Sequence, residues 1–142
     1  MDIENLAGEP RPCRATVETL RTLYLHLVQP GPRDHVVLAC NHGACLEVGL
    51  GWPGARLVVR SGPDGADRAL LGVLGSENVE ARYAAAVIAS GDGIFTQAAG
   101  RLASSGLGVT VVSRRSSLSK RLRMAAQQVL TFDWPVSEAE AA

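Results

Sequence analysis

Residues 87–95 constrain the fold of this chain more than any other part of the sequence. They read Val-Ile-Ala-Ser-Gly-Asp-Gly-Ile-Phe, an apolar strand that ends in a small, flexible turn with one acid, Asp92. Apolar residues at helical spacing follow, and then a second apolar run at 109–112. The pattern predicts a strand, an acidic turn, a helix and a strand. An acid in such a turn either performs chemistry or caps the helix.

The same alternation extends along the whole chain. Helices are predicted over residues 17–28, 67–74, 98–102 and 118–129, and strands over 35–40, 56–60, 84–89, 109–112 and 132–136. Residues 41–50 are only weakly periodic. Strands separated by helices predict an α/β fold with a mostly parallel central sheet and helices on both faces. We expect one domain over residues 1–136 and a mobile acidic tail over 137–142.

Composition narrows the class of protein. With 142 residues, 46% of them hydrophobic, one domain can bury a core. The formal net charge is zero, so no overall field attracts a polyanion. No apolar run reaches the roughly 18 residues that span a bilayer, and the first residues lack a signal-peptide pattern. The three cysteines are an odd set, which suits a reducing compartment. We expect a soluble, cytoplasmic protein with no membrane association.

Three acids stand out by position. Asp2 precedes a predicted turn, Asp67 opens a predicted helix after a strand and loop, and Asp92 follows the next strand. In a parallel sheet, all three are expected near the edge formed by the carboxyl ends of the strands, where ligands of α/β proteins usually bind.

Several motifs then resemble a known family. They are Asp-Ile-Glu-Asn-Leu at 2–6, Gly-Ala-Asp-Arg-Ala-Leu at 65–70, Ser-Gly-Asp-Gly-Ile-Phe at 90–95, Val-Thr-Val-Val-Ser at 109–113 and Ser-Leu-Ser-Lys-Arg-Leu at 117–122. Through them the chain resembles the NYN branch of the PIN-like ribonucleases over nearly its whole length. The resemblance implies a Rossmann-like sheet and a metal-dependent nuclease that cleaves RNA phosphodiester bonds.

The resemblance also implies roles for individual residues. Asp2, Asp67 and Asp92 match the catalytic acids that hold Mg²⁺ or Mn²⁺. Clustered carboxylates repel unless a cation lies between them, and such ions prefer oxygen ligands. Asn5 and Ser90 match residues that orient an acid or the substrate, although either side chain can instead form a turn. Glu4 is a further ligand or a surface acid.

Two departures from the family pattern leave other functions open. Ile94 stands where the family often has a second aspartate, and only Met1 precedes Asp2, where the family has a central strand. We expect the reading frame to extend upstream; otherwise the sheet lacks this strand, or another chain, in a homo-oligomer or a complex, supplies it. The alternative functions are a degenerate module that binds RNA or a protein partner without cleavage, and an interaction module whose acids only cap turns.

A basic run follows the strand at 109–113. It comprises Arg114, Arg115, Lys120, Arg121 and Arg123, with no acid among them. Arg114 and Arg115 are expected to project from the same sheet edge as the acids, where they would contact substrate phosphates. The alternative is a solvated surface. Ser116 or Ser117 is expected to cap the following helix, whose free amides suit a phosphate.

Other candidate sites have weaker support. Cys40, His42 and Cys45 lack a fourth ligand at zinc-site spacing. His26 and His35 have no evident nucleophile partner, and the glycines match neither nucleotide-binding pattern. Trp52 either stacks on a base or packs in its turn, and packing is the expectation.

Overall fold

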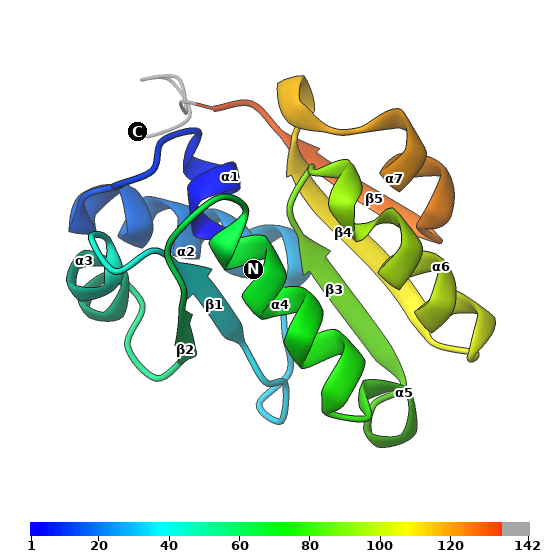
Figure 1. Ribbon diagram of the computed structural model, residues 1–142. Helices are drawn as coiled ribbons and strands as arrows, with labels where there is room; N and C mark the ends of the chain where they lie inside the picture. Colours follow the sequence, from blue (N-terminus) through cyan, green and yellow to red (C-terminus); the bar gives the residue numbers. More distant parts are fainter. Residues whose placement is uncertain (135–142) are drawn as a thin grey trace. The chain divides into compact units, whose positions relative to one another are not determined.

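The computed structural model describes residues 1–134, which form an α/β structure (Figure 1). All pairs of its named strands are parallel, as predicted. The chain divides into two compact units, Met1–Val73 and Leu74–Ala142, and the boundary falls within helix α4 (Gly65–Ser76). Among residues 1–134, no helix has the length and apolar composition to cross a bilayer. The expected acidic tail and the end of the strand expected at 132–136 lie outside the described residues.

The first unit is built around two parallel strands. Its elements before α4 are α1 (Ile3–Ala7), α2 (Arg14–Val28), β1 (Val37–Cys40), α3 (Cys45–Gly51) and β2 (Arg56–Val59). On one edge, β1 pairs with β2. On the other edge, Asp2 forms a parallel bridge with Ala39. Here the Met1 amino group donates to the Val37 carbonyl oxygen at 2.6 Å, and the Ala39 N–H donates to the Met1 carbonyl oxygen at 2.9 Å. Met1 and Asp2 therefore act as a short strand beside β1.

Helices α2 and α3 cross closely in this unit. A Cβ atom at Gly51 would lie 2.7 Å from the Cβ of Val17, so only glycine fits at the crossing. Beside it the rings of Tyr24 and Trp52 lie 5.6 Å apart, and Trp52 is buried. The expectation that Trp52 packs in its turn is confirmed.

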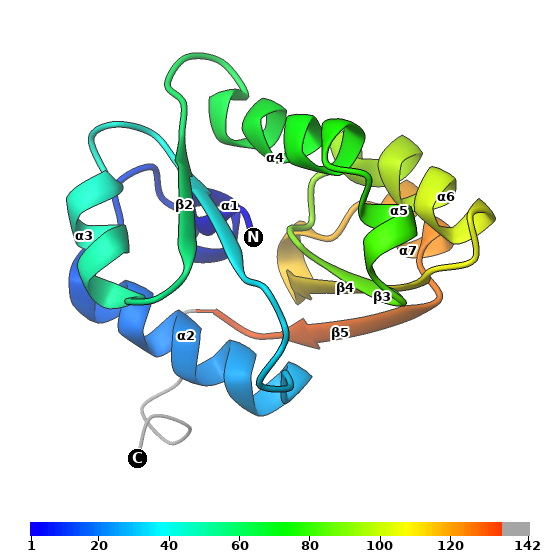
Figure 2. The ribbon, with the colours of Figure 1, turned by 90° about the horizontal axis from the view of Figure 1, so that it is seen from below.

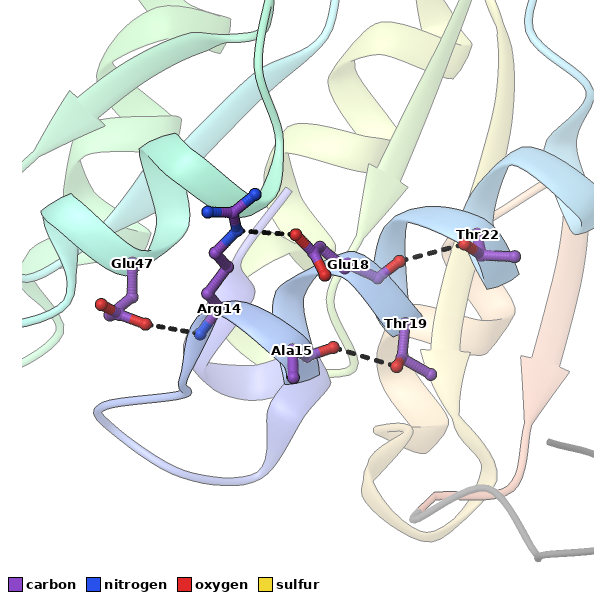
Figure 3. Close-up of polar contacts among 6 residues, drawn as sticks. All are labelled: Arg14, Ala15, Glu18, Thr19, Thr22 and Glu47. Atoms are coloured by element: carbon purple, nitrogen blue, oxygen red, sulfur yellow. Dashed lines mark hydrogen bonds and ion pairs between the residues drawn. The ribbon is translucent and has the colours of Figure 1, made fainter.

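The start of α2 is held by a side chain from α3 (Figure 3). Cys13, which precedes the helix, makes no capping hydrogen bond with its side chain. Instead, Glu47 Oε2 accepts a 2.7 Å hydrogen bond from the backbone N–H of Arg14, whose Nε lies 2.7 Å from Glu18 Oε1. A carboxylate at a helix N-terminus satisfies a free N–H and interacts favourably with the helix dipole.

The second unit contains a three-stranded parallel sheet in the order β3-β4-β5. After α4 its elements are α5 (Val79–Arg82), β3 (Ala85–Ala89), the 3₁₀ turn η1 (Gly93–Phe95), α6 (Thr96–Ser104), β4 (Gly108–Arg114), the 3₁₀ turn η2 (Arg115–Ser117), α7 (Lys120–Ala125) and β5 (Gln128–Phe132). Helices α6 and α7 pack together, and α6 also contacts β4 (Figure 2). Phe95, Leu102 and Leu122 are buried between these layers.

Several sequence-based boundaries were wrong. The helix predicted over 118–129 is only α7, because Gln128–Phe132 instead forms β5 and pairs with β4. Val129 lies opposite Val111 in this ladder, so strand pairing overrode a weak helical pattern. Helices α1, α3 and α5 were missed because each has seven or fewer residues, too short for a clear period. Helix α4 begins at Gly65, two residues before the predicted start.

Candidate functional site

Asp92 lies in a hydrogen-bonded turn at the carboxyl end of β3. Its Oδ1 accepts a 2.9 Å hydrogen bond from the Ile94 N–H and so caps η1. The Asp92 N–H in turn donates to Ser90 Oγ at 3.2 Å, and Ser90 is fully buried. The local roles considered for both side chains, capping and turn formation, are therefore present. They also hold the half-buried carboxylate of Asp92 in one place.

The Asp92 turn, defined as residues 90–93, packs against the segment that follows β4. The Ser119 N–H donates a 2.8 Å hydrogen bond to the Gly91 carbonyl oxygen. A Cβ atom at Gly91 would lie only 2.4 Å from Ser113 Oγ and from the Ser117 carbonyl oxygen. Glycine is required here because the two chain segments approach too closely for any side chain.

Two arginines of the basic run lie at the same sheet edge as this turn. Arg114 ends β4 and Arg115 begins η2, and β4 is the parallel neighbour of β3. Both therefore lie at the carboxyl edge that carries Asp92, as predicted. Arg115 Nε forms a 3.1 Å ion pair with Asp133 Oδ1, and both side chains are about two-thirds exposed. Exposed pairs of this kind contribute about 0–1 kcal/mol, so this one leaves Arg115 available to a phosphate.

The cap expected for the following helix was misplaced. Ser116 and Ser117 lie in η2, and Ser119 is the residue that precedes α7. Ser119 makes no capping hydrogen bond with its side chain, whereas its backbone N–H reaches Gly91. The sequence around Ser119 contains no signal for this contact, because the acceptor, Gly91, lies in the turn after a different strand, β3.

In the first unit, Asp2 and Asp67 are both buried, with 4% and 8% of their surface exposed. Asp2 caps α1, and its Oδ1 accepts a 3.2 Å hydrogen bond from the backbone N–H of Asn5. Asp67 lies in the first turn of α4.

Glu4 has a role that neither expectation described. Its Oε1 accepts hydrogen bonds from the backbone N–H of Asn41 at 2.7 Å and from Asn41 Nδ2 at 2.9 Å. Glu4 therefore joins α1 to the end of β1, rather than lying free on the surface.

The three acids predicted to bind a metal ion belong to different units. Asp2 and Asp67 belong to the first unit and Asp92 to the second. Across residues 1–134, no three side chains of His, Cys, Asp or Glu form a group that could hold a metal ion. The donor atoms near Asp92 are carboxylate and hydroxyl oxygens, the type that Mg²⁺ and Mn²⁺ prefer. The three-acid metal site stays a prediction.

A histidine and a serine that sequence reasoning did not pair lie together in the first unit. Ser61 Oγ lies 2.8 Å from His42 Nδ1 and accepts a 3.0 Å hydrogen bond from the His42 N–H. Both follow parallel strands, β1 and β2, so the strand pattern could have predicted the contact.

Burial and the nearby Cys45 raise the pKa of the Cys40 thiol to about 11. A thiol that stays protonated near neutral pH is a poor nucleophile.

Comparisons with known proteins give the fold only. No protein-family model matches the sequence, and no curated protein is similar to it. The chain is similar to the crystal structure of a protein of unknown function from Vibrio parahaemolyticus, with a TM-score of 0.60 and 13% sequence identity. The match covers 93% of this chain and 89% of that chain. At this identity the likeness concerns the fold and carries no function.

Proposed function

We propose that this protein is a divalent-metal-dependent ribonuclease with a Rossmann-like, PIN-type fold that acts on RNA in the cytoplasm. One observation carries the proposal. The Asp92 turn, Arg114 at the end of β4 and Arg115 directly after it all lie at the carboxyl edge of the β3-β4-β5 sheet. An acid and two arginines at one edge of a sheet are an arrangement suited to a phosphodiester, because the cations can bind the phosphate while the acid serves the reaction.

Each residue has a role in this proposal. Asp2, Asp67 and Asp92 supply carboxylate ligands for Mg²⁺ or Mn²⁺, which when bound would activate water and offset the charge on the phosphate. Ser90 orients Asp92 through the hydrogen bond between its hydroxyl and the Asp92 N–H. Asn5 supports the Asp2 cap. Arg114 and Arg115 contact phosphates and position the RNA.

A cleavage assay tests the proposal. End-labelled single-stranded RNA is incubated with the purified protein and Mg²⁺, Mn²⁺ or EDTA, and the products are resolved on a denaturing gel. We expect cleavage with either metal and none with EDTA. Metal-independent cleavage, or no cleavage under any condition, would contradict it. Calorimetric titration with Mn²⁺ measures metal binding separately.

A second candidate is a module that binds RNA or a protein partner without cleavage. Ile94 favours it, because this half-buried, apolar side chain stands where the resembled family often has a second aspartate. The Ile94 backbone N–H is hydrogen bonded to Asp92, but its side chain offers no metal ligand. Tight RNA binding that is unaffected by Mn²⁺ and leaves the RNA intact would select this candidate over the nuclease.

A further inference from the structure

Charge is distributed unevenly along the second unit. Between Asp92 and Asp133 the sequence contains no acid. The same stretch contains six cations, namely Arg101, Arg114, Arg115, Lys120, Arg121 and Arg123. Arg101 is paired with Glu80 and Arg115 with Asp133, and both acids lie outside the stretch. The zero net charge of the chain therefore conceals a basic segment.

Helix α7 presents three of these cations to solvent. Leu122 is its only fully buried side chain, and Lys120, Arg121 and Arg123 are all exposed. At 100° per residue, the three cations cover the arc opposite Leu122. Within residues 1–134, none of the three side chains makes a hydrogen bond or an ion pair. Their charges are therefore available to a partner.

We infer that α7 is a docking surface for the sugar-phosphate backbone of an RNA strand. The inference rests on the proposed function, which makes RNA the ligand of the Asp92 turn. The surface is continuous with that turn, because Ser119, directly before Lys120, is hydrogen bonded to Gly91. A strand held at Asp92 would therefore continue over α7, where flexible cations bind phosphates without reading the bases.

The composition of α7 favours RNA over a lipid surface. A helix that lies in a membrane interface needs a broad apolar face. In α7 the one large apolar side chain that is exposed is Met124, at 85%. The helix has six residues, about 9 Å at 1.5 Å per residue, which leaves little area to bury in lipid.

Binding measured without cleavage tests the surface. A fluorescein-labelled, 20-nucleotide single-stranded RNA is titrated in EDTA with the full chain and with the triple variant Lys120→Gln, Arg121→Gln and Arg123→Gln, at several NaCl concentrations. For single-stranded RNA, each phosphate contact steepens the plot of log binding constant against log salt concentration by about 0.7. The variant lacks three such contacts, so its slope should be shallower by about 2. We expect its affinity to fall at least tenfold at low salt. An unchanged affinity and slope would overturn the inference.

Matched variants separate charge from folding. Arg11→Gln, Arg14→Gln and Arg33→Gln remove the same charge from exposed positions of the first unit and should leave the slope unchanged. Arg121→Lys with Arg123→Lys keeps the charge and should retain full binding. Equal losses of RNA affinity in both triple variants would overturn the inference. So would a full chain that binds vesicles of phosphatidylcholine and phosphatidylserine through the α7 cations but does not bind RNA. RNA binding that depends on α7 in a protein that never cleaves would refute the nuclease and leave the surface intact.

Discussion

The backbone N–H of Ser119 donates a 2.8 Å hydrogen bond to the carbonyl oxygen of Gly91, and this contact joins the basic segment after β4 to the Asp92 turn. It fixes an acid and several cations at one edge of the sheet. The acid is held by its own capping bond, so its position does not depend on a bound ligand.

Gly91→Ala should destabilise the second unit. The added Cβ atom would lie 2.4 Å from the Ser117 carbonyl oxygen, so the backbone after β4 must move. Overpacking of this kind costs about 1–3 kcal/mol of unfolding free energy. Urea unfolding measures the loss. Gly100→Ala is the control, because its Cβ would enter open space in α6, where alanine is neutral or stabilising.

The free energy of unfolding should rise with pH between about 5 and 8 in a chain that starts at Met1. Burial lowers the pKa of the Met1 amino group from 8.0 to about 5, and Asp2 opposes the change more weakly. In this window the unfolded chain binds a proton that the folded chain releases. At about 1.4 kcal/mol per pH unit, the gain is at most about 4 kcal/mol.

The control for this pH dependence is a chain with Gly-Ser added before Met1. Its Met1 nitrogen is an amide, which keeps the donor to Val37 but cannot ionise. Urea unfolding of both chains at pH 5, 6.5 and 8 should give a shallower profile for the extended chain. Parallel profiles would show that the Met1 amine is not responsible.

Glu47→Ala should shorten or loosen the start of α2. The substitution leaves the Arg14 N–H without its acceptor, and loss of a helix cap costs about 1 kcal/mol. Glu47→Gln keeps an oxygen acceptor and should recover most of the stability. Thermal unfolding followed by circular dichroism compares the three proteins. Equal stability of Glu47→Ala and the parent chain would refute the capping role.

Ile94→Asp should strengthen metal binding. The substitution adds a carboxylate two residues after Asp92, at the half-buried position where the family resemblance expects one. Calorimetric titration with Mn²⁺ should show a lower dissociation constant than that of the parent chain. An unchanged constant would mean that side chains at position 94 point away from the metal.

Long elements with a clear period were predictable from the sequence, and short ones were not. The strand before Asp92 and the helix after Arg14 combine apolar periodicity with strong stop signals, so both appear close to where they were predicted. The placement of Arg114 beside the Asp92 turn followed from parallel topology alone. Three short helices and β5 depend on tertiary contacts, which sequence periodicity does not record.

The hydrogen bonds between side chains and distant segments were not predictable from the sequence, because they join residues far apart in the chain. The Glu4 bond to Asn41 spans 37 residues, and the Ser61 bond to His42 spans 19. The motif resemblance predicted Asp92 and Ser90 as site residues, and the structure shows that both also support the turn in which they lie.

Asp92→Asn tests the central claim most directly. Asparagine keeps an oxygen acceptor for the Ile94 N–H but removes the charge, so a residue that only caps η1 should tolerate the change. Asp34→Asn is the matched control, because Asp34 accepts a similar bond, 2.8 Å from the Gly31 N–H, in an exposed turn of the first unit. The measurement is the rate of Mn²⁺-dependent RNA cleavage, with unfolding followed in parallel. We predict that Asp92→Asn abolishes cleavage with the fold intact while Asp34→Asn cleaves normally. Cleavage by Asp92→Asn at the parent rate would contradict the assignment of a nuclease site to this turn.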